Sequence, residues 1–297
     1  MRTKSSFRRT ARYASLLLLC LALPAALQAG DYTYITNETG TITITGYTGP
    51  GGDVTIPDTI TDLPVTTFSD NAFSHRTNLT SVTLPKSVTS IGAWVLGVCS
   101  SLTAINVQPA NPAYSSLDGV LFTKNHDTLV EYPAGRAGGY TVPASVTNIG
   151  NIAFEACVNL SSVAIPDSVA IIGSSAFVYC TGLTNLIIGT NVTTIGPEAF
   201  RTCSSLTTVT IPDKVIAIGD RTFSFCGSLT NVIVGNSVTR IETMHSFSAP
   251  AWPVLRSATM SPASETTPSA SAKPWPVSPY PTGLRALETT PSRSVSV

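Results

Sequence analysis

A stretch of 23 residues recurs along this 297-residue chain, and the recurrence constrains the fold more than any single residue does. The clearest copies begin at Leu160, Leu183, Leu206 and Leu229, and an earlier copy begins at Leu79. A fixed period of this length indicates stacked units, because one unit is too short to bury its own apolar face. The sequence therefore predicts a solenoid in which each copy forms one coil.

Within one copy, the pattern of apolar residues changes between the first half and the second. In the copy from Leu160, Val163 and Ile165 alternate as in a short strand, and Pro166 ends that strand because proline cannot donate to a ladder. The second half predicts a short helical turn that packs one face inward. Its inward residues are Ala176, Phe177 and Cys180.

The array is predicted to span residues 54–241, and two of its early copies differ from the pattern. The first copy, residues 54–78, keeps Ala72 and Phe73 at the usual place but has Arg76 where later copies have cysteine. The copy from Leu79 has Val95 and Leu96 in place of Ala-Phe. Residues 30–53 alternate like paired strands, and we expect them to form an N-terminal β cap over the open end of the first coil.

The copy from Leu102 contains an insertion at about residues 109–140. Two apolar runs flank the turn-forming residues 124–127, which predicts a β-hairpin. Insertions in solenoids tend to map to one face and often to binding, so this hairpin is the best candidate for a recognition surface. The alternative is a structural variant unit that has no partner. The candidate recognition residues are Asp118, Lys124, Asp127, Glu131 and Tyr132.

The consensus of the copies is L-x-x-V-x-I-P-x-x-V-x-x-I-G-x-x-A-F-x-x-C, over roughly Asp31 to Ile241. It resembles the BspA-type leucine-rich repeats of bacterial surface proteins, and the DGVLF…LVEYP insertion is similar to a variant unit of that family. The resemblance implies a leucine-rich-repeat solenoid that is β-rich with short helical turns. It also implies export and surface display, with adhesion attributed to some members.

Residues 1–29 have the features of a secretory signal peptide. A basic head is followed by the apolar run LLLLCLAL, which is too short to span a bilayer, and cleavage is expected after Ala29. We therefore expect a secreted or cell-surface protein with no transmembrane segment after the signal is removed. Residues 30–241 contain 14 acidic and 8 basic residues, a net charge of −6, which argues against binding to nucleic acid.

The cysteines after the leader occupy one position of the repeat. Disulfides between neighbouring copies or metal binding are conceivable roles, but the number is odd and there is no close CxxC pair. A buried ladder of small apolar side chains fits the pattern better. The predicted ladder consists of Cys99, Cys157, Cys180, Cys203 and Cys226, with Phe154, Phe177, Phe200 and Phe223 alongside it.

The outward positions of the predicted strands contain no acid, base or histidine. General acid–base or nucleophilic catalysis requires such groups, so we expect a non-enzymatic protein without a cofactor or metal. The strip of hydroxyls, amides and small apolar groups can offer hydrogen bonds and shallow contacts to a protein or glycan. These positions are Ser81, Thr83, Ala104, Asn106, Ser162, Ala164, Asn185, Ile187, Thr208, Thr210, Asn231 and Ile233.

The last segment, residues 242–297, is rich in Ser, Pro and Thr and reads as a disordered tail. A second interpretation is repeat DNA translated in a shifted frame after the loss of one base near Ile241. Trp252 and Trp275 are 23 residues apart and each precedes proline, so both give alanine codons in that frame. A truncated array would have an open apolar end and would favour self-association.

The sequence as a whole predicts an exported repeat protein that binds protein or glycan, or mediates adhesion. The alternative is a structural spacer in a larger envelope protein, truncated by a frameshift. The sequence does not identify the ligand.

Overall fold

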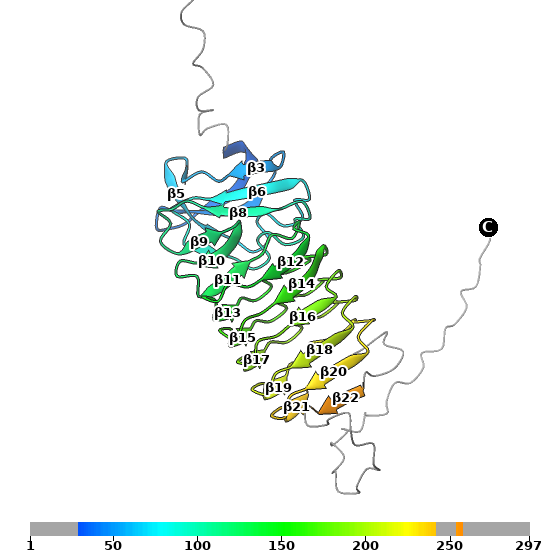
Figure 1. Ribbon diagram of the computed structural model, residues 1–297. Helices are drawn as coiled ribbons and strands as arrows, with labels where there is room; N and C mark the ends of the chain where they lie inside the picture. Colours follow the sequence, from blue (N-terminus) through cyan, green and yellow to red (C-terminus); the bar gives the residue numbers. More distant parts are fainter. Residues whose placement is uncertain (1–28, 242–253, 258–297) are drawn as a thin grey trace, which may run out of the picture. The chain divides into compact units, whose positions relative to one another are not determined.

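The computed structural model describes residues 29–241 and 254–257. Its coils are stacked one after another, and each coil adds one strand to each of two sides (Figure 1). Strands of neighbouring coils pair in parallel at the spacing of the repeat, as in the pairs Ser162↔Asn185 and Ile172↔Ile195. The expected signal peptide, apart from Ala29, lies outside the described residues.

The first coils are closed by an antiparallel pair of strands, as expected of a cap. After a short 3₁₀ helix, η1 (Ala29–Asp31), strand β1 (Tyr32–Thr36) pairs antiparallel with β2 (Ile42–Tyr47). Strand β2 then pairs in parallel with β5 (Leu63–Phe68), which pairs with β7 (Ser90–Ile91) in parallel and with β4 (Thr59–Ile60) antiparallel. On the other side, β3 (Gly52–Thr55), β6 (Leu79–Leu84) and β8 (Ala104–Val107) form a parallel sheet.

The later coils repeat one geometry. Along one side, β12 (Gly138–Thr141), β14 (Leu160–Ala164) and β16 (Asn185–Ile187) form one sheet. The strands β18 (Thr208–Ile211), β20 (Asn231–Val234) and β22 (Val254–Ser257) form another. Along the other side run β13 (Asn148–Ile149), β15 (Ile171–Ile172), β17 (Thr194–Ile195), β19 (Ala217–Ile218) and β21 (Arg240–Ile241).

Strand β22 lies beyond the expected end of the array at Ile241. It pairs in parallel with β20, and the pair Asn231↔Val254 keeps the 23-residue spacing. The ladder therefore continues for four residues into the predicted tail. The rest of that tail lies outside the described residues, and the frameshift stays a prediction.

The third side of each coil consists of hydrogen-bonded turns. In place of the predicted helical turn, the segment forms successive i→i+3 turns, in which the N–H of Val178 donates to the carbonyl of Ser175 at 3.0 Å and the N–H of Cys180 to that of Phe177 at 3.2 Å. It does not continue as a helix because Ser175 and Tyr179 have φ of 54° and 62°, outside the right-handed helical region. The turns also join the coils, since the N–H of Phe177 donates to the carbonyl of Ala199 at 2.7 Å.

A stack of phenylalanines runs through the centre of the coils. The rings of Phe154, Phe177, Phe200 and Phe223 follow one another with centroids 4.5, 5.3 and 5.5 Å apart and nearly parallel planes. Cys99, Cys157, Cys180, Cys203 and Cys226 are buried and free. The thiol of Cys180 donates to the carbonyl of Phe154 in the preceding coil at 3.0 Å. The cysteines thus pack as small side chains whose weak donors are satisfied.

The insertion forms a three-stranded antiparallel meander. Its strands are β9 (Tyr114–Leu117), β10 (Val120–Thr123) and β11 (Thr128–Glu131), and residues 124–127 form the predicted turn between the last two. Strand β11 then pairs in parallel with β13, which joins the meander to the regular coils.

Strand β10 is buried on both of its faces. Val120 and Phe122 belong to the apolar core of the later coils, whereas Leu121 between them belongs to the core of the first coils. We call the meander β9–β11 the partition, because it separates these two cores. The partition is therefore an internal element, which corrects the expectation of a surface hairpin.

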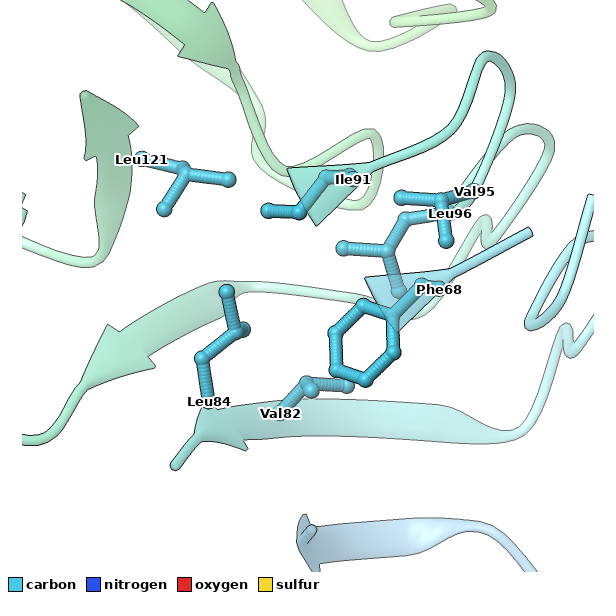
Figure 2. Close-up of a pocket in the computed structure, with 7 residues that line it drawn as sticks. All are labelled: Phe68, Val82, Leu84, Ile91, Val95, Leu96 and Leu121. Carbon is cyan, nitrogen blue, oxygen red and sulfur yellow. The ribbon is translucent and has the colours of Figure 1, made fainter. Parts of the chain in front are cut away.

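A small apolar cavity lies in the core of the first coils, beside the partition. Its lining residues come from β5, β6, β7, the turn at residues 95–96 and β10, and Figure 2 shows their side chains around it. They are Phe68, Val82, Leu84, Ile91, Val95, Leu96 and Leu121. Leu96 occupies the position of the stacked phenylalanines, so the smaller side chain accounts for the unfilled space.

Candidate functional site

The five residues predicted to form a recognition surface are not brought together. Asp118 lies in the turn between β9 and β10, and Lys124 and Asp127 lie in the turn at the opposite end of β10. Glu131 and Tyr132 are buried, with exposed fractions of 8% and 3%. The prediction that these two residues contribute to an exposed surface is therefore wrong.

The burial of Glu131 and Tyr132 follows from the register of the insertion. The N–H of Tyr132 donates to the carbonyl of Ala153, as the N–H of Phe154 donates to that of Ala176. Tyr132 thus occupies the phenylalanine position of its coil, and Glu131 occupies the alanine position. The thiol of Cys157 lies 3.8 Å from the carbonyl of Tyr132, which continues the Cys–Phe pattern. The dipeptide Glu131-Tyr132 therefore occupies the positions that Ala-Phe occupies in the regular coils.

The exposed polar residues of the partition are engaged in local contacts. The ammonium of Lys124 donates to the carbonyl of Pro109 at 3.2 Å. The hydroxyl of Thr123 donates to the carboxylate of Asp127, and this hydrogen bond lowers the pKa of Asp127. The guanidinium of Arg136 donates to the carbonyl of Asp118 at 2.8 Å. These contacts stabilise the two turns.

The outward strand positions present a surface of small side chains. Asn185, Thr208 and Thr210 are exposed, and Ile187 is exposed by 57%. Threonines at the edge of the strands bind the preceding coil, as where the hydroxyl of Thr184 donates to the carbonyl of Ser161 at 3.0 Å. In the described part of the chain, no group of three or more His, Cys, Asp or Glu residues could hold a metal ion.

The turn side carries a distinct group of large side chains, which we call the aromatic–arginine cluster. Its residues are Tyr179, Glu198, Arg201, Arg221 and Phe225. The guanidinium of Arg201 lies over both rings, 5.8 Å from the centroid of Tyr179 and 5.5 Å from that of Phe225. The two rings are exposed by 43% and 41%. Three consecutive coils therefore contribute one continuous π–cation–π arrangement.

An acidic residue holds the two arginines of this cluster. Both carboxylate oxygens of Glu198 are used, one 3.4 Å from Arg201 Nη1 and the other 3.4 Å from Arg221 Nη1. Such partly exposed ion pairs contribute little to stability, so their main effect is to fix the orientation of Arg201. The second arginine of the cluster also pairs with Asp220, whose Oδ2 lies 3.7 Å from Arg221 Nε, so that two acids balance the two arginines beside the exposed rings.

Left-handed backbone positions explain why these side chains are exposed. Tyr179, Thr202 and Phe225 all have positive φ and occupy the same place in three successive turns, two residues after the stacked phenylalanine. This cluster was not predicted from the sequence. An aromatic residue at a position that holds Ala156 or Thr202 in other copies was the available signal.

The fold defines a leucine-rich-repeat solenoid, and the comparisons agree. The model of the BspA type leucine rich repeat region matches residues 53–126 and 138–249 with six copies, which is more than half of the chain. The chain belongs to this family. A search of curated proteins finds no match.

Two solved structures are similar in fold. A leucine-rich repeat protein from Eubacterium ventriosum is 21% identical, with a TM-score of 0.54, over 71% of this chain and 82% of that one. The pneumococcal vaccine antigen PcpA is 18% identical, with a TM-score of 0.51, over 72% of this chain and 83% of that one. Within the described ranges, the structure has no helix of the length and hydrophobicity required to cross a membrane.

Proposed function

We propose that the protein is a non-enzymatic binding module, secreted or displayed at the cell surface, that contacts a protein or glycan through the aromatic–arginine cluster. Export is supported by the basic and apolar leader of residues 1–29. The chain belongs to a family of stacked repeats, and stacking creates an extended surface of the kind that repeat proteins use for binding.

The observation that carries the proposal is the position of Arg201 between the rings of Tyr179 and Phe225. Tyrosine and arginine are over-represented among the residues that dominate interface energies, and aromatic rings lose little conformational entropy on binding. Glu198 and the two rings already restrict Arg201, so a partner would meet a pre-organised surface.

A spacer role is the alternative, and the strand side favours it. The outward residues Asn185, Thr208 and Thr210 resemble one another from coil to coil, and no charged side chain interrupts them. A surface of this kind can separate other segments without contacting a ligand.

A binding experiment separates the two roles. The full chain and the double variant Tyr179→Ala/Phe225→Ala are titrated against purified extracellular-matrix proteins and soluble glycans. The control is Ile187→Ala, which removes an exposed apolar side chain from the strand side. We expect a ligand of micromolar or better affinity whose binding weakens at least about tenfold, or 1.4 kcal/mol, in the double variant only. Equal binding by all three proteins contradicts the cluster as the site, and no saturable binding supports the spacer.

A further inference from the structure

Two glutamates lie where the core of the first coils meets the core of the later coils. Glu131 ends β11 at the core position that holds Ala153 and Ala176 in the next coils. Glu155 lies in the following turn, and its Oε2 atom is 2.6 Å from the point that a Cβ on Gly97 would occupy. Since Gly97 belongs to the coil from Leu79, the carboxyl group of Glu155 reaches across the partition to the first coils.

The carboxyl group of Glu155 lacks the partners that a buried charge requires, and neither glutamate of the pair is in an ion pair in the described ranges. Glu155 Oε2 is buried and has no hydrogen-bond partner. The ion pairs within 4.0 Å in the described ranges involve the carboxylates of Asp58, Glu198 and Asp220 only. A buried carboxylate without a cation is costly, and a neighbouring carboxylate increases the cost.

The groups that face the pair from the surrounding coils are the thiols of Cys99 and Cys157, the phenol of Tyr132 and the cations of Arg76 and Arg136. Burial raises the pKa of the Cys99 thiol to about 11, and the charges of Glu131 and Glu155 contribute to this shift. Burial also raises the pKa of Tyr132. Arg76 is the cation that acts on Cys99 from the first coil, and Arg136 lies over the Tyr132 ring at 5.6 Å. Cys157 acts on Tyr132 from the coil of Glu155.

Burial determines the protonation of the pair itself. Burial, and then the charge of Glu155, raise the pKa of Glu131 well above its ordinary value. Burial raises the pKa of Glu155 to about 7. In the unfolded chain both groups return to about 4.3, so the folded state holds protons that the unfolded state releases. Stability from Glu155 is therefore present below about pH 4 and is lost as pH rises through about 7. The raised pKa of Glu131 makes its contribution fall in the same direction, as pH rises through the pKa of its folded state.

We propose that Glu131 and Glu155 form a proton-dependent latch between the two cores. The latch is closed when the carboxyl pair is protonated, because neutral groups can share the buried space. When both groups ionise, their repulsion opens the contact between Glu155 and the turn at Gly97. Each repeat contacts only its neighbours, so one weak interface can open while the remaining coils stay folded.

Hydrogen exchange of the full chain, measured by mass spectrometry at about pH 5 and about pH 8, tests the latch. After correction for the intrinsic exchange rate, we expect the opening equilibrium of peptides around Gly97 and Glu131 to increase about tenfold or more. Peptides from β18 to β19, far along the array, serve as the internal reference. The variants Glu131→Gln and Glu155→Gln each remove one ionisable carboxyl group, so the opening equilibrium should change less between the two pH values. Glu38→Gln makes the same change at an exposed residue and should leave the response intact.

Two results would overturn the latch. One is an opening equilibrium that does not change with pH in the unmodified chain. The other is an equal pH response in the Gln variants. If a Gln variant does not fold, carbon-13 NMR titration of the glutamate carboxyls in the unmodified chain tests the proposal, because it measures the pH at which each carboxyl group ionises. Midpoints near 4.3 for all glutamates contradict the proposal, and two midpoints of about 6 or higher support it.

Discussion

The ring of Tyr132 stacks on the ring of Phe154, with centroids 5.0 Å apart and planes inclined by 27°. This contact carries the phenylalanine stack of the later coils into the coil that contains the insertion. The insertion therefore lengthens one coil without interrupting the central stack. Its extra residues form the partition.

Removal of the Tyr132 ring should destabilise the array. Tyr132→Ala deletes a buried aromatic side chain, and such truncations cost about 3–5 kcal/mol. Tyr132→Phe keeps the ring and is the matched control, with an expected change below about 1.5 kcal/mol. Urea unfolding followed by circular dichroism gives both values. A small loss in the alanine variant would mean that Tyr132 does not belong to the stack.

Filling the cavity beside the partition should stabilise the protein. Leu96 lines that cavity and occupies the phenylalanine position, so Leu96→Phe should add about 0.5–2 kcal/mol to the free energy of unfolding. The control is Leu102→Phe, at a buried leucine outside the cavity, where overpacking should cost about 1–3 kcal/mol. Thermal denaturation distinguishes the two. Destabilisation by both changes would contradict the assignment of Leu96 to the unfilled position.

Asn111 should be essential for the insertion. Its amide donates to the carbonyls of Pro85 and Val88, both at 2.8 Å, and its side-chain oxygen accepts from the N–H groups of Ala113 and Tyr114. The side chain is fully buried. We expect Asn111→Ala to cost at least about 2 kcal/mol, since each buried backbone group left without a partner costs about 1–3 kcal/mol.

The exposed Asn125 provides the comparison for this change. Asn125→Ala should alter the free energy of unfolding by less than about 0.5 kcal/mol. Equal values for the two variants in urea unfolding would refute the anchoring role of Asn111.

The repeat made the regular coils predictable, because the same residue types return every 23 positions. Phe177 and Cys180 could be assigned to the core from one copy and then transferred to the others. The same reasoning failed at Glu131 and Tyr132, since a charged and a polar residue there suggested solvent. Only the hydrogen-bond register shows that they replace Ala-Phe.

The aromatic–arginine cluster could not be predicted for a different reason. Tyr179, Arg201 and Phe225 come from three coils, and the spacing alone does not tell which turn residues point outward. That depends on the left-handed backbone at Tyr179 and Phe225, a conformation that neither residue type favours. Likewise, alternation in the insertion could not show that both faces of β10 are covered.

Cysteine accessibility tests the partition most directly. Val120→Cys and Leu121→Cys place a thiol on opposite faces of β10, and Asn125→Cys places one in the exposed turn. Labelling of the folded chain with iodoacetamide is followed peptide by peptide, with the native buried thiols as the reference. We predict that Cys at 120 and at 121 both label as slowly as the native buried thiols, whereas Cys at 125 labels rapidly. Rapid labelling at either 120 or 121 would contradict a partition buried on both faces.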